Sequence, residues 1–321
     1  MKYILPVVLS LSITNVVAQT IKIDGSSTVY PITEGIAEEF QKATKIKVTV
    51  GVSGTGGGFK KFCRGETDVA NASRSITKQE MEACGQQGIK YYEFPIAFDA
   101  MTVVINPKNN FVKQLTVQQL RTMWEPAAQG KITHWNQIDP KFPNQRISLF
   151  GPGADSGTFE YFTEAVVGKS KASRGDFTAS EDDNILVKGV STNPFGLAYF
   201  GYAYYEENKS KIRAVPIVNK DGQAVYPSEK TVMDGTYNPL ARPIFIYVNA
   251  ASVGKPEVKR FIDFYMKNAA DIIREIKFVP LPEKVYQANL ENLNRGRIGT
   301  VFGGHARVGM TIDELVNAEV K

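Results

Sequence analysis

Three segments of this chain place small hydroxyl side chains and glycines where an expected strand gives way to an expected helix. They are Asp24-Gly25-Ser26-Ser27-Thr28, Ser53-Gly54-Thr55-Gly56-Gly57-Gly58 and Asp155-Ser156-Gly157-Thr158. A helix N-terminus offers unpaired backbone N–H groups and the positive end of the helix dipole. Glycine lets the backbone come close to a ligand, and Ser or Thr adds a donor. One such loop can bind an oxyanion, and three that converge could surround a tetrahedral one.

Each segment alone has a simpler explanation, because Ser and Thr are common N-caps and Gly is a common turn residue. For a single loop this explanation is favoured, but three loops in one chain favour anion binding. None of them matches a nucleotide signature. The segment at 54–58 lacks the Gly-Lys-Ser/Thr ending of a P-loop. Asp68 follows it too closely to be the acidic residue of a dinucleotide fingerprint.

Two charged residues follow the second segment, in Thr67-Asp68-Val69-Ala70-Asn71-Ala72-Ser73-Arg74. The Arg74 guanidinium can bind an oxyanion through two parallel hydrogen bonds. The Asp68 carboxylate would repel an anion unless that anion carries a proton, as HPO4 and H2PO4 do and sulfate does not. Alternatively, Asp68 and Arg74 pair with each other at the surface. The spacing leaves both interpretations open.

The elements that must position these loops alternate between strands and helices. Alternating apolar residues predict strands at 21–23 and 46–52, and i, i+4 spacing of Ile32, Ile36 and Phe40 predicts a helix that begins at Pro31. Thr77 and Glu80 form a predicted capping box. Further expected strands cover 68–70, 98–105, 147–150 and 244–248, and further helices cover 116–124, 159–166, 258–265 and 285–293. This alternation predicts an α/β architecture.

Composition excludes several classes of protein. The 321 residues carry a formal charge of +5, with 43% hydrophobic and 22% charged residues, as in an ordinary globular protein. The charge is spread out, so nucleic acid is not an expected partner. After the first twenty residues no apolar run is long enough to span a bilayer.

Residues 1–18 read as a signal peptide, with Lys2, an apolar run and Ala18 at the cleavage position. No Cys follows the cleavage site, so we expect an exported protein without a lipid anchor. In such a chain Cys63 and Cys84 predict one disulfide, although two free buried thiols remain an alternative. Their spacing to His134 and His305 predicts no metal site.

Together, the segments Ile23–Pro31, Ser53–Gly57, Thr67–Arg74 and Asp155–Phe159 resemble the phosphate-binding proteins of bacterial ABC transporters, the PstS family. The resemblance runs from about Ile21 to about Phe302. It implies a type II periplasmic-binding-protein fold, in which two α/β lobes are joined by two hinge strands and the ligand lies in the cleft between them. We expect one lobe at 19–99 and 250–321, the other at 100–249, and hinges near 98–104 and 244–249.

The resemblance also implies the site and its partners. It assigns phosphate binding to Ser27, Thr28, Val29, Ser53, Thr55, Asp68, Ser156, Gly157 and Thr158, with Asp68 as the carboxylate that senses protonation. Pro152 stands where better-known members carry an Arg, so we assign the cationic role to Arg74. The implied protein is a periplasmic monomer without a cofactor that delivers inorganic phosphate to a membrane permease with an ATPase partner.

Three rival functions remain, and one of them, an adhesion or surface role, is neither supported nor excluded by the sequence. The first is an enzyme, such as a phosphatase or serine hydrolase, but Ser156 does not lie in Gly-x-Ser-x-Gly and only His134 and His305 could serve as an imidazole base. The second is a binding protein for another oxyanion, such as sulfate or molybdate. A protonation-sensing carboxylate argues against the fully deprotonated anions.

Overall fold

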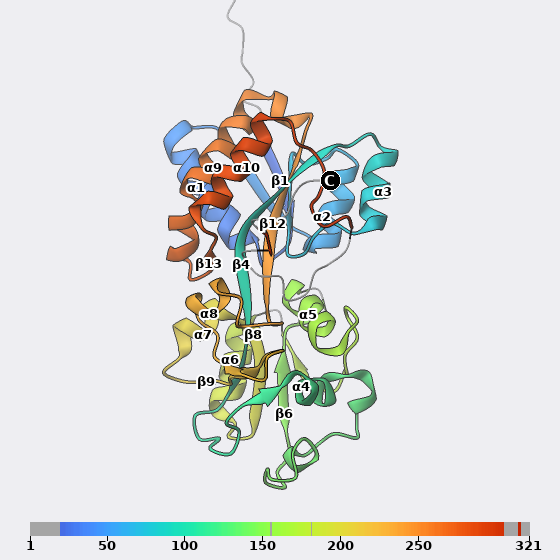
Figure 1. Cartoon of the computed structure of the whole chain (residues 1–321), viewed down its shortest axis with the longest axis vertical. Helices are drawn as coiled ribbons and strands as arrows, with labels where there is room; N and C mark the ends of the chain where they lie inside the picture. The colour runs from blue at the N-terminus through green and yellow to red at the C-terminus, as the bar shows by residue number, and fades with distance from the viewer. Residues whose placement is uncertain (1–19, 155, 181, 305–313, 316–321) are drawn as a thin grey trace, which may run out of the picture.

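The computed structural model describes residues 20–154, 156–180, 182–304 and 314–315, so the predicted signal peptide lies outside the described residues. The chain forms two lobes stacked along its long axis, and two long strands, β4 (Tyr91–Ile105) and β12 (Ala241–Asn249), run between them (Figure 1). Both lobes combine strands with covering helices. The predicted two-lobed α/β fold is confirmed.

The first lobe is built around parallel strands β1, β2 and β3, which β12 joins in antiparallel orientation. Its remaining elements are β1 (Ile21–Gly25), α1 (Tyr30–Thr44), β2 (Val48–Val52), α2 (Gly54–Cys63), β3 (Val69–Ala72), α3 (Lys78–Gln86), η4 (Ser252–Gly254), α9 (Pro256–Glu275), β13 (Val279–Pro280) and α10 (Glu283–Asn294). Because the three parallel strands end at one edge, the loops that follow β1, β2 and β3 meet there.

The second lobe is built around β8 and β6, which are parallel to each other, with β8 antiparallel to β4. Its elements are β5 (Leu115–Thr116), α4 (Val117–Trp124), η1 (Pro126–Ala128), η2 (Trp135–Gln137), β6 (Ser148–Gly151), α5 (Gly157–Phe162), η3 (Thr163–Val167), β7 (Thr178–Ala179), α6 (Asp183–Thr192), β8 (Gly196–Gly201), α7 (Tyr202–Asn208), β9 (Arg213–Ala214), β10 (Ile217–Val218), β11 (Ala224–Val225) and α8 (Glu229–Met233). The loop that precedes α5 follows β6 at the edge facing the first lobe.

Strand β4 belongs to both lobes and changes partners in its middle. Its residues up to Ala100 pair with β12, and those from Met101 pair with β8. A continuous strand therefore carries the chain from one sheet into the other. Strand β12 carries the chain back between the lobes and brings Arg242 directly across from Asp99.

Local sequence signals explain the helices that flank the cleft. Helix α3 begins with the predicted capping box, in which Thr77 Oγ1 accepts from the Glu80 backbone N–H and Glu80 accepts from the Thr77 backbone N–H. Helices α2 and α3 are joined by the predicted disulfide between Cys63 and Cys84, which is confirmed. Among the described helices, none has the length and apolarity that crossing a membrane requires.

Candidate functional site

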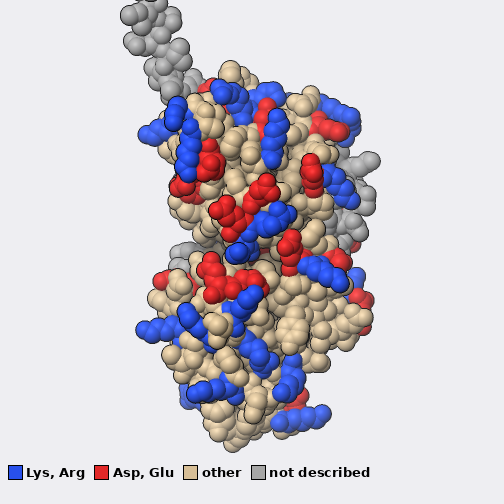
Figure 2. Space-filling model, turned by 90° about the vertical axis from the view of Figure 1, so that its left-hand side faces the viewer, with Lys and Arg blue, Asp and Glu red and all other residues tan. Residues whose placement is uncertain are grey.

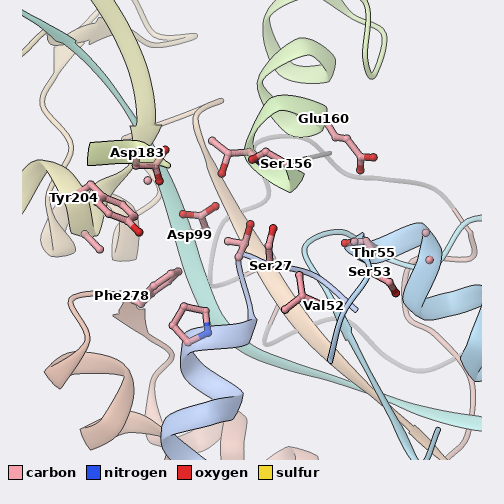
Figure 3. Close-up of a pocket in the computed structure, with 18 of the residues that line it drawn as sticks. Ser27, Val52, Ser53, Thr55, Asp99, Ser156, Glu160, Asp183, Tyr204 and Phe278 are labelled. Atoms are coloured by element: carbon pink, nitrogen blue, oxygen red, sulfur yellow. Dashed lines mark hydrogen bonds between the residues drawn. The ribbon is translucent and has the colours of Figure 1, made fainter. Parts of the chain in front are cut away.

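A cleft of about 760 Å³ lies between the lobes, where the predicted loops meet (Figure 3). The predicted site residues that line it are Ser27, Thr28, Ser53, Thr55, Ser156 and Thr158. In Figure 3, Ser27 and Thr55 lie on the side of the first lobe, and Ser156 faces them from the start of α5. The structure therefore brings together loops that are more than a hundred residues apart in the sequence.

The first lobe contributes the N-termini of α1 and α2, and these two differ in their free N–H groups. Val29 is the N-cap of α1 and Ser53 that of α2, and neither makes a side-chain hydrogen bond to its helix. Val29 is fully buried and is not among the residues that line the cleft. Ser53 instead donates to the carboxylate of Asp24, which Lys61 also binds at 2.7 Å. In α1 the Tyr30 N–H donates to the Ser26 carbonyl, the Ile32 N–H donates to the Val29 carbonyl, and Pro31 has no N–H. The N–H groups that point to an anion-binding site are therefore those of the first turn of α2.

Ser73 joins the site from the end of β3, although the sequence analysis did not assign it a role. Its backbone N–H donates to Thr55 Oγ1 at 3.1 Å, and the two hydroxyl oxygens lie 3.0 Å apart. Both side chains are buried. This contact fixes the Thr55 hydroxyl at the floor of the cleft. A hydroxyl at the end of a short buried strand was the available sequence signal.

The second lobe contributes the start of α5, where Ser156 Oγ accepts from the Thr158 backbone N–H at 3.2 Å. Gly157 abuts the first lobe so closely that an added Cβ would lie 2.5 Å from Ser73 Oγ and 3.2 Å from Thr28 Oγ1. Only glycine permits this approach. Gly157 therefore places the backbone of one lobe against two hydroxyl groups of the other.

The cationic groups stand around these loops, and most already have acidic partners. Arg74 forms two hydrogen bonds with Glu80, at 2.8 and 2.9 Å. Burial alone would lower the pKa of Arg74, but Glu80 outweighs it and holds that pKa above its usual value. Lys171 pairs with Glu160 at 3.0 Å. Lys60 also lines the cleft.

Arg74 lies beside the cleft rather than in its lining. It borders a second, small cavity of about 20 Å³ together with Ser73 and Arg242. The Cβ of a side chain at Gly56 would be 3.9 Å from a terminal nitrogen of Arg74, so its guanidinium is next to the first turn of α2. Its charge is close to the predicted anion site, while direct contact with an anion stays a prediction.

Asp68 is not brought to this cleft, because it and Arg74 are not on one loop. Residues 69–72 form β3, so Asp68 lies at the start of that strand and Ser73 at its other end, about 16 Å away at the usual rise per residue. Its carboxylate accepts from Lys22 N–H at 2.9 Å, Ser252 Oγ at 2.7 Å and Lys255 Nζ at 2.8 Å.

These donors change the interpretation of Asp68. Burial alone would raise its pKa, but the hydrogen bonds from Lys255, Lys22 and Ser252 outweigh burial and hold the pKa below its usual value. The carboxylate thus ties the start of β3 to the segment that precedes α9. The surface alternative was wrong as well, since Asp68 pairs with Lys255 and not with Arg74.

Two charged residues that the sequence analysis did not single out lie on the two strands that run between the lobes. Asp99, on β4, lines the cleft, and Arg242, on β12, pairs with it. Both are buried. A charged residue inside an otherwise apolar strand was the sequence signal, because a buried charge needs a partner.

On the face that Figure 2 presents, basic and acidic side chains are interspersed and form no single stripe. His134 belongs to the second lobe, at the start of η2, and its Nδ1 lies 2.8 Å from Thr133 Oγ1. It is not among the residues that line the cleft. His305 lies outside the described residues.

Comparison with known proteins agrees with this architecture. Residues 12–269 match the model of the PBP superfamily domain. The protein SphX of Synechococcus elongatus is 54% identical over 297 residues, which cover 92% of this chain and 88% of that protein. The phosphate-binding protein PstS of Staphylococcus saprophyticus is 39% identical over 278 residues, 85% of this chain and 84% of that protein.

A solved structure described as a possible phosphate binding protein from Planctomyces limnophilus is similar in fold as well. It superimposes with a TM-score of 0.73 at 45% sequence identity, and the match covers 86% of this chain and 98% of that one. With two relatives well above 30% identity over most of the chain, the assignment does not depend on the fold alone. The chain belongs to the PBP superfamily and, within it, to the PstS family of phosphate-binding proteins.

Proposed function

We propose that this protein captures inorganic phosphate in the cleft between its lobes and delivers it to the membrane permease of an ABC transporter. The observation that carries the proposal is the contact of Gly157 with Ser73 and Thr28. It brings hydroxyl groups and the N-termini of α2 and α5 to one point, which suits a small tetrahedral anion. The printed names of the PstS relatives support the same ligand.

Phosphate is favoured over sulfate by the acidic side chains of the cleft. Asp99, Glu160 and Asp183 line it. A carboxylate can accept a hydrogen bond from a protonated phosphate, whereas sulfate has no proton to donate and would only be repelled. Asp68 cannot serve in this way from the start of β3.

Closure would bring the second lobe onto anion already held by the first. We assign the lobes to residues 19–99 with 250–321 and to residues 100–249, and we place the hinge where β4 changes partners and β12 crosses beside it. Contacts from Ser156, Gly157 and Thr158, made only in the closed form, would shift the open–closed equilibrium. The protein would act as a periplasmic monomer, exported through residues 1–18 and without catalytic activity.

Calorimetric titration of residues 19–321, stripped of ligand and refolded, tests the proposal at pH 7. We expect one-to-one heat with phosphate and little with sulfate or molybdate. Tight sulfate or molybdate binding would replace the ligand but keep the oxyanion site. Absence of heat with all three anions would refute the site. Release of a chromophore from p-nitrophenyl phosphate would instead support a phosphatase.

A further inference from the structure

A buried ion pair bridges the two strands that connect the lobes. Asp99 on β4 and Arg242 on β12 are register partners, and each side chain is 3% exposed. Arg242 donates to Asp99 Oδ2 through Nε at 3.2 Å and through a terminal nitrogen at 3.0 Å. Both strands thus contribute to one interaction at the crossing between the lobes.

The same guanidinium reaches the anion loop of the second lobe. Its other terminal nitrogen donates to the backbone carbonyl of Gly157 at 2.8 Å. Arg242 also lies over the ring of Tyr161, 4.8 Å from the centroid. The Tyr161 hydroxyl in turn donates to the carbonyl of Ala241 at 2.9 Å. These contacts hold the plane of the guanidinium in one orientation.

This hydrogen bond sets the direction of the peptide that follows Gly157. In a trans peptide the carbonyl and the next N–H point in opposite directions. With the Gly157 carbonyl directed at Arg242, the Thr158 N–H is directed away from Arg242, toward Ser156, which lines the cleft. Arg242 thus orients the Thr158 backbone N–H, which donates to Ser156 Oγ, without lining the cleft itself.

Arg242 also places a guanidinium, paired with Asp99, beneath a loop that has no Arg at position 152. Pro152 is buried and occupies that position. Arg242 and Arg74 both border the small cavity of about 20 Å³ behind Ser73. Two guanidinium groups therefore stand behind the donors of both lobes, one of them anchored to the hinge.

We propose that Arg242 is a positioning residue that couples the anion loop at 156–158 to the hinge through Gly157 and Asp99. The inference rests on the proposed function, and it names the residue through which contact with the ligand is linked to movement of the lobes. Lysine cannot replace the arginine, because its ammonium cannot keep the planar set of donors that binds Asp99 and Gly157 together. Closure on the anion then loses its alignment even though the charge remains.

The test compares Arg242→Lys with Arg174→Lys. Arg174 is a matched control in the second lobe: it is also buried, it pairs with Asp176, and it donates to the carbonyls of Met123 and Ile132. For each protein we would measure phosphate affinity, the phosphate dissociation rate, the melting temperature without ligand and the shift in that temperature with phosphate.

We expect both variants to melt at lower temperature, while only Arg242→Lys binds phosphate at least tenfold more weakly and releases it faster. Wild-type affinity in Arg242→Lys would overturn the inference, as would an equal loss of affinity in Arg174→Lys. Failure of the wild-type protein to bind any of the three anions would refute the proposed function and this inference with it. Phosphate binding by the wild type and by Arg174→Lys separates the two cases.

Discussion

Glu93 is a carboxyl group in β4 that is held without a cationic partner among the described residues. Its carboxylate accepts from the Tyr247 hydroxyl at 2.6 Å, from Thr300 Oγ1 at 2.5 Å and from the Val301 backbone N–H at 3.0 Å. Burial raises the pKa of Glu93 from 4.5 to about 7, although these three hydrogen bonds act in the opposite direction. The group therefore titrates near neutral pH in the folded protein.

The sign of the effect on stability follows from proton binding. Between pH 4.5 and about 7 the folded state binds more protons at Glu93 than the unfolded state, so the free energy of unfolding falls as pH rises through this window. At about 1.4 kcal/mol per pH unit, the rise in pKa corresponds to at most about 3 kcal/mol. Because Glu93 as a whole residue is intermediate in exposure, we discount this upper figure for solvent screening and expect about 1–2 kcal/mol.

Glu93→Gln removes this titration, and urea unfolding at pH 5, 6, 7 and 8 measures it. We expect the wild type to lose about 1–2 kcal/mol more than the variant between pH 5 and pH 8. The neighbouring phenols do not titrate there, because burial raises the pKa of Tyr91 to about 12 and that of Tyr247 well above its usual value. Glu82→Gln, at an exposed position in α3, is the control.

The reasoning would be refuted if the stability difference between wild type and Glu93→Gln stayed constant from pH 5 to pH 8. It would also fail if Glu82→Gln changed the slope equally. Tyr247 links Glu93 to the Ile76 N–H, which donates to its hydroxyl at 2.8 Å, so ionisation acts close to the segment that carries Ser73. The change of phosphate affinity with pH should therefore also be compared between the wild type, Glu93→Gln and Glu82→Gln.

Three further perturbations test separate parts of the structure. Gly157→Ala should weaken phosphate binding at least tenfold by calorimetry, since its Cβ would lie 2.5 Å from a hydroxyl oxygen of the first lobe, whereas Gly85→Ala meets no atom within 4 Å and should leave affinity unchanged. Removal of the disulfide by Cys63→Ser with Cys84→Ser should lower the free energy of unfolding by about 3 kcal/mol in urea, because the bond closes a loop with a sequence separation of 21; an unchanged midpoint would contradict this. Asp68→Asn should reduce the free energy of unfolding above pH 4, where the wild-type carboxylate is ionised in the folded state. In the wild type this stabilisation disappears as pH falls through the lowered pKa of Asp68. If the variant changed the ratio of phosphate to sulfate affinity, Asp68 would have to be returned to the binding site.

The loops were predictable because their signals are local. Ser156 and Thr77 act within a few residues of their own position, as an N-cap and a capping box, and short-range physics decides such features. Within the first lobe they meet because parallel strands end at one edge of a sheet, whereas the sequence analysis stated the convergence of all three loops only as a condition. The two-lobed arrangement came from the resemblance, since periodicity shows only that strands and helices alternate.

Asp68 was misplaced for a reason that is also local. Asp68 and Arg74 are six positions apart, which is close along a loop but far along an extended strand. Once residues 69–72 pair with β1 and β12, the two side chains lie at opposite ends of β3. A segment written Val69-Ala70-Asn71-Ala72 has too little alternation to reveal its length, so the sequence could not fix the separation.

Charged residues inside buried strands carry information that the sequence does show, although not their partners. Glu93 and Asp99 interrupt the apolar run of β4, and Arg242 interrupts that of β12. Each must be compensated, because an isolated buried charge is too costly to keep. Asp99 and Arg242 satisfy this requirement through each other, across a separation of 143 residues that no local pattern spans. Glu93 satisfies it with neutral donors, and burial raises its pKa to about 7. A charged residue in a predicted core strand is therefore a candidate for a buried ion pair, for a binding site or for a group that titrates near neutral pH.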